Sequence, residues 1–496
     1  MTKFGLDPYA SIGLTENPFM VQALKPDAQG KRLLVGRDED IRLVAQRLHK
    51  HGKITCLDGH VGVGKTSLVN VAAYVCFQAY LEAETPQLLI PAIASFQLKK
   101  DGSVDQFCTE VFQRVAQTLC QYREHLSGYD IKSGNLPQLN AWMNSPIIQH
   151  LNVSADGSIG IGIPKIVNVG IKGGGSTSSQ VNQSAGFAQN GLELTVRNLL
   201  DEIFGEKGNG GIVCVIDNIE LLETGLAARR TLEALRDKLF NVNGLRWVFC
   251  GANGVIHSLA ASPRLSAFLS TPVINIANVH PTAIDELVRA RLREFHTDPE
   301  RAEDELPIAL DDMKHLYHIV NFNLRDLLAL ADEFCEFAVG AGTPVRIKEK
   351  KRERFNRWLQ EQTKVRYQSL SSRISQNAWA VLDIAMSNKF QGTFGSADHS
   401  VFNQNSKVQI ERSTFDKWLR DLVKLGLLTK SIDDEQGGDE EEGFNRDVYT
   451  VTAKGALVTY ARSKDNLVNL SLMESDWMKR VHHQSPVSFG GKRGGS

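Results

Sequence analysis

The sequence lacks an excess of charge and several features that mark specialised classes of protein. Its 496 residues carry 56 Lys and Arg against 57 Asp and Glu, which excludes a globally basic nucleic-acid binder. Seven cysteines are scattered without a CxxC pair or metal-ligand spacing, which favours a reduced chain over a disulfide scaffold. No window reaches the ~20 apolar residues of a membrane span, and the first residues lack the apolar stretch of a signal peptide. We therefore expect a cytoplasmic protein with no membrane partner.

The chain does contain short apolar runs that alternate with helical stretches. The runs cover 54–57, 88–94, 212–216, 247–250 and 273–276. Such runs are typical of strands that are buried on both faces of a parallel sheet. Their alternation with helices predicts a doubly wound α/β sheet, and 496 residues leave room for two to four domains in all.

The loop after the first run matches a phosphate-binding pattern at every position. Residues 59–66 read Gly-His-Val-Gly-Val-Gly-Lys-Thr, which fills G-x-x-x-x-G-K-[ST] between a strand and a helix. The glycines allow successive N–H groups to face phosphate oxygens, and the helix N-terminus adds partial positive charge. Lys65 is expected to reach the β- and γ-phosphates and Thr66 to ligate Mg²⁺. The expected contacts of ATP and Mg²⁺ are Gly59, Val61, Gly62, Val63, Gly64, Lys65, Thr66 and Ser67.

The third apolar run ends in a carboxylate, which is typical of a metal-holding strand. Asp217 is expected to lie beside Thr66 and to hold the hydration shell of the metal ion. The next residue is Asn218, so the nearest carboxylate that could orient the attacking water is Glu220. Two interpretations stay open: Glu220 acts as the base, or hydrolysis is slow and the nucleotide state matters more than turnover.

These motifs together resemble an AAA+ ATPase, closest to the origin-recognition and helicase-loader branch with its C-terminal winged helix. The resemblance covers about 17–461 and implies a P-loop AAA+ parallel sheet with a helical lid, followed by a winged-helix domain. Segments 17–19 and 34–38 resemble the lining of the adenine pocket, which implies contacts from Val35, Gly36 and Arg37. The resemblance also implies a polar sensor at Asn253, an arginine finger at Arg264 and a second sensor at Arg325.

An arginine finger acts on a neighbour's nucleotide, so Arg264 implies a homo-oligomer with ATP at subunit interfaces. Arginine suits this role because its rigid fork of donors offsets the charge that develops on the γ-phosphate. Arg229 and Arg230 are alternatives for the same role. The expected activity is ATP hydrolysis, with the catalytic set Lys65, Asp217, Glu220, Asn253, Arg264 and Arg325.

The last third of the chain changes pattern. The segment 346–366 has nine Lys and Arg against three Glu, and it is either a solvated helix or a contact for a phosphate backbone. Helices at 375–387 and 413–425, followed by strands at 427–430 and 448–451, predict a winged helix. A polar stretch at 391–407 stands where a compact second helix is expected. Seven carboxylates over 433–442 should make the wing repel DNA.

An insertion at 152–191 separates the second and third apolar runs. Its alternation of apolar and polar residues from Ile159 to Ile171 predicts a hairpin, which is either a surface loop or an arm that pairs with a partner. The expected domains are 1–280 for nucleotide binding, including this insertion, 281–345 for the helical lid, 346–373 for a basic linker helix, 374–465 for the winged helix and 466–496 for a tail.

Two classes of function fit these features. The first is a nucleotide-switched oligomeric assembly protein that binds protein partners through the winged helix and the insertion, as in a bacterial defence or signalling complex. The near-neutral charge and the acidic wing favour it. The alternative is a DNA-associated AAA+ ATPase of the initiator or loader type, which the basic segment 346–366 favours.

Overall fold

A computed structural model defines the fold in two compact units. It describes residues 7–100, 102–126, 136–137, 139, 189–205, 210–222, 225–252, 254–260, 262–340, 346–387, 390, 392–405, 410–433 and 446–465. The sheet unit comprises Ala23–His60 and Gly64–Ile276, and the helical unit comprises Met1–Gln22, Val61–Val63 and Ala277–Ser496. The domain limits expected from the sequence stay predictions, and each unit is considered by itself.

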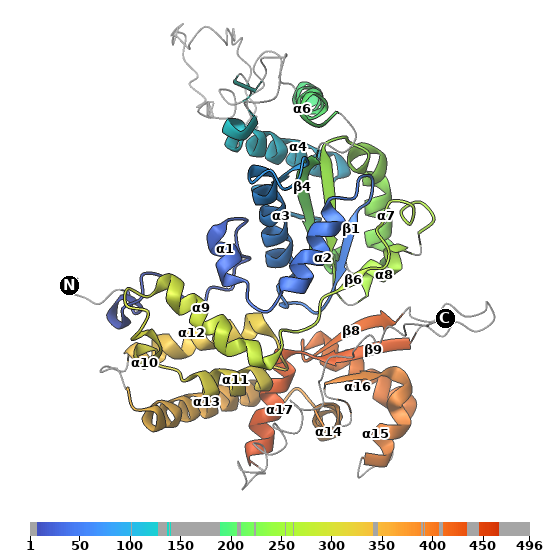
Figure 1. Ribbon diagram of the computed structural model, residues 1–496. Coiled ribbons are helices and arrows are strands. Elements are labelled where there is room, and N and C mark those ends of the chain that lie inside the picture. The colour runs from blue at the N-terminus through green and yellow to red at the C-terminus, as the bar shows by residue number, and fades with distance from the viewer. Residues whose placement is uncertain are drawn as a thin grey trace, which may run out of the picture. The chain divides into compact units, whose positions relative to one another are not determined.

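The sheet unit contains a six-stranded sheet in which every described pair of strands is parallel (Figure 1). Its order is β2 (Leu88–Pro91), β4 (Gly210–Asp217), β5 (Leu245–Cys250), β1 (Thr55–Asp58) and β6 (Ile274–Asn275), with β3 (Phe96–Gln97) also paired to β4. The expected α/β class with a parallel sheet is confirmed. The run expected at 88–94 is shorter in the structure, where β2 ends at Pro91 and β3 follows separately at Phe96–Gln97.

Helices cover the sheet, and Figure 1 shows α3 and α7 on opposite sides of the strands. The helices of this unit are α1 (Ala28–Leu33), α2 (Asp38–Leu48), α3 (Lys65–Leu81), α4 (Val104–Gln121), α6 (Gln189–Phe204), α7 (Gly225–Leu235) and α8 (Val255–Ala260). Helix α3 contacts β2 and α2, and α8 contacts β1. Ser103 caps the N-terminus of α4, since its side chain accepts the N–H of Asp105. Val111, Val115 and Leu119 recur on one fully buried face of the helix.

The helical unit begins after β6 with a group of packed helices. They are α9 (Ile284–Phe295), α10 (Ala302–Glu305), α11 (Leu310–Ile319), α12 (Leu324–Gly340) and α13 (Lys348–Ser371). The basic segment expected as a linker helix is α13, and it contributes to the core. Phe355, Trp358 and Leu359 are at most 3% exposed, and the ring of Phe355 meets that of Phe334 edge-on at 5.2 Å.

The C-terminal part of this unit has the order of elements that is typical of a winged helix. The elements are α14 (Gln376–Ala385), β7 (Thr393–Gly395), α15 (His399–Asn405), α16 (Arg412–Lys424), β8 (Leu428–Asp433), β9 (Arg446–Val451) and α17 (Ala453–Asp465). Strands β7, β9 and β8 form an antiparallel sheet. The polar stretch at 391–407, which the sequence set apart from the usual pattern, does contain a second helix, α15. Helix α15 forms there because Phe402 is fully buried and stacks on Phe390, a contact that the polar neighbours hide in the sequence.

Several expected features lie outside the described residues. They are the hairpin at 159–171, Asn253, the wing residues 434–442 and the tail 466–496. Residues 189–191, expected as the end of the insertion, belong to the start of α6. No described helix has both the length and the apolar character needed to cross a bilayer.

Candidate nucleotide-binding site

The phosphate loop leaves β1 at the carboxyl edge of the sheet, the edge at which parallel α/β sheets bind their ligands. Gly62 and Gly64 have φ angles of 87° and 92°, which side chains with a Cβ rarely adopt. Gly64 is the N-cap of α3, so this 17-residue helix begins directly at Lys65. The backbone therefore has the turn and the helix N-terminus that a phosphate cradle requires.

Lys65 keeps its ammonium group inside this loop. Its Nζ atom donates to the carbonyl oxygens of Gly59 at 2.8 Å and His60 at 3.1 Å, and the residue is 7% exposed. The side chain thus folds back across the loop. A cation in that position can offset the negative charge of β- and γ-phosphates.

Thr66 and Asp217 meet although 151 residues separate them in the sequence. The Oγ1 atom of Thr66 donates to Oδ2 of Asp217 at 2.5 Å, and Asp217 is 9% exposed at the end of β4. Strand β5 lies between β4 and β1, so the contact depends on the order of the sheet. A hydroxyl and a carboxylate at this spot are the hard oxygen ligands that Mg²⁺ takes beside substrate phosphates.

A turn after β4 directs Glu220 toward the site. Asn218 has a φ angle of 54°, a left-handed conformation that Asn tolerates better than most residues, and its N–H donates to Asp217. The chain then forms the short helix Ile219–Leu222. The Glu220 carboxylate accepts the N–H of Ala252, and no described residue donates to its buried Oε2 atom. Burial raises the pKa of Glu220, the nearby charge of Asp217 adds to the rise, and Lys65 opposes it.

Asp58 is a further carboxylate at this edge, and the sequence analysis missed it. It ends β1 immediately before the loop, and its carboxylate accepts the N–H of Gly254. Burial raises its pKa to about 6, although the charges of His257 and Lys65 oppose the shift. The available signal was the one that identified Asp217, because Asp58 also closes an apolar strand with a carboxylate.

The segment expected near the adenine lies in the sheet unit before α2. Val35 is half-buried, Gly36 has a φ angle of 72°, and Arg37 is 6% exposed and pairs with Asp40 at 3.0 Å. The start of this unit is tied to α3, because the Ser67 hydroxyl accepts the N–H of Leu24 at 3.0 Å. Ser67 therefore has an anchoring contact in addition to its expected role.

The three candidate arginine fingers differ in their surroundings. Arg229 pairs with Glu233 at 2.9 Å, and the same Glu233 oxygen accepts the Ser262 hydroxyl at 2.5 Å. Arg230 and Arg264 are exposed, and neither makes a hydrogen bond or ion pair with the part of the chain that the structure describes. A group that acts on a neighbouring subunit needs this freedom, which favours Arg230 or Arg264 over Arg229.

The other two expected residues of the site are the sensors Asn253 and Arg325. Arg325 lies in the first turn of α12, in the helical unit, so its role stays a prediction. Asn253 lies outside the described residues, between Ala252 and Gly254, the two positions whose N–H groups bind Glu220 and Asp58.

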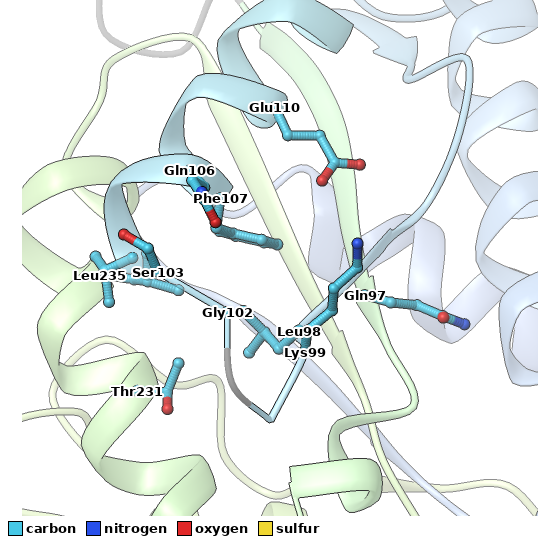
Figure 2. A pocket seen from close by; sticks show the side chains of 11 residues that line it. Gln97, Leu98, Lys99, Gly102, Ser103, Gln106, Phe107, Glu110, Thr231 and Leu235 are labelled. Carbon is cyan, nitrogen blue, oxygen red and sulfur yellow. The ribbon is translucent and has the colours of Figure 1, made fainter. Parts of the chain in front are cut away.

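A separate hollow of about 70 Å³ lies beside the end of β3 (Figure 2). It is lined by residues from β3, from the loop that follows β3, and from α4 and α7, among them Gln97, Lys99, Gln106, Glu110 and Thr231. Gln97 is the register partner of Asp217 in the sheet, so the hollow begins one strand away from the phosphate site. No sequence motif falls on its lining.

The sheet, the glycine loop and the Thr66–Asp217 contact define a P-loop nucleotide-binding fold. No family model and no curated protein matches the chain. Solved structures do match. The ORC1 protein of Aeropyrum pernix, in complex with DNA, is 12% identical at a TM-score of 0.39, with 88% of this chain and 94% of that one covered.

Two further structures are similar over most of the chain. The ORC2 protein of Aeropyrum pernix, with ADPNP and ADP, is 10% identical at a TM-score of 0.41, with 90% of this chain and 98% of that one covered. A Walker-type ATPase of Pyrococcus abyssi is 13% identical at a TM-score of 0.42, with 89% and 99% covered.

Proposed function

We propose that the chain is an AAA+ ATPase that binds ATP with Mg²⁺ at the phosphate loop and hydrolyses it slowly. The observation that carries this proposal is the contact of Thr66 with Asp217 beside the Lys65 ammonium group. These three side chains are the ones that a triphosphate and its metal ion need at one place. Slow turnover is proposed because Asn218 occupies the position directly after Asp217, and the nearest carboxylate is three residues on.

In this proposal each residue has one task. The loop N–H groups bind phosphate oxygens, and Lys65 offsets the charge of the β- and γ-phosphates. Thr66 and Asp217 would hold Mg²⁺, which when bound would neutralise charge on the phosphates. Glu220 accepts the proton of the attacking water, while the bond between the γ-phosphorus and the bridging oxygen breaks and ADP leaves.

We further propose that the active form is a homo-oligomer with Arg264 from one subunit at the nucleotide of the next. The exposure of Arg264, and the lack of a hydrogen bond or ion pair between it and the described residues, support this assignment. A guanidinium in that position would stabilise negative charge in the transition state, as arginine fingers do. ATP would then favour assembly, because the nucleotide contributes to both sides of the interface.

For the biological role, the state of the basic segment favours a nucleotide-switched assembly protein. Seven of its nine cations already bind described acidic side chains or carbonyl oxygens. The pairs are Arg346–Glu305, Lys348–Asp311, Lys351–Asp304, Arg352–Asp312, Arg354–Ala338, Arg357–Glu353 and Arg366–Glu333. Such a helix has few free cations for a phosphate backbone. The setting in a defence or signalling complex stays a prediction from the sequence.

The second candidate is a DNA-associated ATPase of the initiator or loader type, and one surface favours it. Helix α16, the helix that reads DNA in many winged helices, exposes Lys417, Arg420 and Lys424. No described residue makes an ion pair or hydrogen bond with these three side chains. Duplex binding through α16 would lose affinity steeply with salt, whereas binding of a protein partner would depend on salt less.

Isothermal titration calorimetry tests the nucleotide site directly. The wild-type chain should bind ATP with Mg²⁺, and Lys65→Ala should not. Lys364→Ala is a matched control, because Lys364 is an exposed residue of α13 that makes no hydrogen bond or ion pair with a described residue. Unchanged ATP affinity in Lys65→Ala would reject the proposed site.

A further inference from the structure

Two carboxylates at the phosphate edge share an uncommon state. One buried oxygen of Asp58 and one of Glu220 receive no hydrogen bond from the described residues. Asp285 and Asp312 in the helical unit also have one such oxygen, but the other oxygen of each binds a cation, Lys314 or Arg352. Asp58 and Glu220 make no ion pair with a described residue, and because buried polar atoms normally have partners, this pair requires an explanation. The two residues come from different elements, since Asp58 ends β1 and Glu220 lies in the short helix after β4.

The same stretch of backbone holds both carboxylates. Strand β5 lies between β4 and β1, and the residues that follow it donate N–H groups to either side. Ala252 donates to Glu220, and Gly254 donates to Asp58. The charge of Lys65 lowers the pKa of both carboxylates, and one buried oxygen of each receives no hydrogen bond from a described residue.

We propose that Asp58 is a second catalytic carboxylate of this ATPase site and shares the attacking water with Glu220. The inference rests on the proposed function. One free oxygen accepts a hydrogen bond from the water, and the other takes its proton as the new oxygen–phosphorus bond forms. The bond between the γ-phosphorus and the bridging oxygen breaks, ADP leaves with that oxygen and its electron pair, and the carboxyl group passes the proton to the released phosphate.

The position of Asn218 explains why two carboxylates would be needed. A base directly after Asp217 would stand on the rigid end of β4, whereas Glu220 follows a left-handed turn. A second carboxylate at the end of β1 would hold the water in a defined position, because β1 is itself held by strands paired on both of its sides. The groups that face Asp58 are His257 on α8, Lys65 on α3 and Glu220. With a pKa of about 6, Asp58 can exchange a proton close to neutral pH.

The proposal has a consequence that is independent of nucleotide. A carboxyl group whose pKa rises from 3.8 in the unfolded chain to about 6 in the fold binds its proton more tightly when folded. Ionised Asp58 therefore destabilises the fold, with an effect that grows from about pH 4 to pH 6 and is complete above pH 6. Neutral Asn at this position should raise Tm by a few degrees at pH 8, and by less at pH 5.

The experiment compares the full-length chain with Asp58→Asn, Glu220→Gln and the double variant. Glu84→Gln is the control, because Glu84 is exposed and lies three residues beyond the C-terminal end of α3. The measurements are ATP affinity by calorimetry, phosphate release from pH 5 to pH 9, and Tm without nucleotide. We expect Asp58→Asn to keep ATP affinity within about threefold and to lower turnover by about 10- to 100-fold. The fall of wild-type turnover below about pH 6 should weaken in this variant.

Three results would decide against the inference. Wild-type turnover with an unchanged pH profile in Asp58→Asn would remove Asp58 from the reaction. A lower Tm at pH 8 together with lost ATP binding would make Asp58 a structural residue of the loop. Failure of the wild-type chain to bind ATP would reject the proposed function itself, whereas intact binding with an unaffected variant rejects only the second carboxylate.

Discussion

The carboxylates of the phosphate site and the cations of helix α13 differ in how fully their hydrogen-bonding atoms are paired. At the phosphate site, Asp58 and Glu220 are largely buried and each keeps one oxygen without a described donor. Along α13, six of the eight cations bind acidic side chains or carbonyl oxygens, and even the buried Lys351 donates to the Asp304 carbonyl at 2.7 Å. Both regions stand out in the sequence as clusters of function-bearing residues. Their difference indicates that the first is arranged to receive a ligand and the second to hold a helix in place.

The largest effect is expected at Lys65. Lys65→Ala removes the cation that offsets phosphate charge, so ATP affinity should fall by at least about 100-fold. Calorimetry with Mg²⁺ measures the loss, and an unchanged thermal melt of the nucleotide-free variant would show that the fold is intact. If ATP still binds to this variant, Lys65 serves only the fold, as the cations of α13 do.

Glu220→Gln should separate binding from turnover. The amide keeps the shape of the side chain and cannot take a proton, so ATP should bind while phosphate release falls by roughly 10- to 1,000-fold. Phosphate release under saturating ATP measures the effect. Undiminished release would assign the proton to another group, and Asp58 is the first candidate.

The trans role of Arg264 predicts partial rescue in mixtures. Arg264→Ala and Lys65→Ala should each be inactive alone, while a mixed oligomer contains interfaces in which one subunit binds ATP and its neighbour supplies the finger. ATPase activity across mixing ratios, alongside mass photometry, measures the rescue. Absence of rescue in folded variants that co-assemble would exclude a finger at Arg264, and the same test with Arg230→Ala then follows.

Helix α13 should respond in stability and leave nucleotide binding unchanged. Arg352 pairs with Asp312, whose side chain is 4% exposed, so Arg352→Gln leaves a buried carboxylate without its cation. We expect a loss of about 1–3 kcal/mol in the free energy of unfolding. Lys364→Gln, which has no described partner, should stay within about 0.5 kcal/mol. Equal effects of the two variants would refute the structural role of the α13 cations.

The smallest effect is expected for DNA. At ~0.15 M salt the screening length is about 8 Å, so the seven carboxylates of 433–442 should repel a duplex. Replacing them with Ser or Asn should increase duplex affinity modestly, and Ala at the Lys and Arg positions of 346–366 should decrease it. Filter binding over a salt series measures both. Weaker binding after neutralisation of the wing would reverse the role assigned to this domain.

The sequence predicted those parts of the site that depend on neighbouring residues alone. The phosphate loop is a contiguous pattern, and the apolar strand that ends in Asp217 is another, so both could be located before any fold was known. The same holds for the parallel sheet, because long apolar runs between helices leave few alternatives. Helix α15 was missed because its stabilising contact, Phe402 against Phe390, is a feature of the core and leaves no apolar period in a polar stretch.

The sequence by itself therefore determined the class of fold and the place of the phosphate loop, since short-range backbone preferences and hydrophobic burial act locally. Only the tertiary structure decided which charged groups have hydrogen-bond or ion-pair partners and which keep an oxygen without one. The left-handed turn at Asn218 brings Glu220 to the site, and the order of the strands brings Ala252 and Gly254 between Glu220 and Asp58. Along α13, the partners of the cations lie as far as 48 residues away in the chain. Charge interacts through space, and the chain order does not encode those distances.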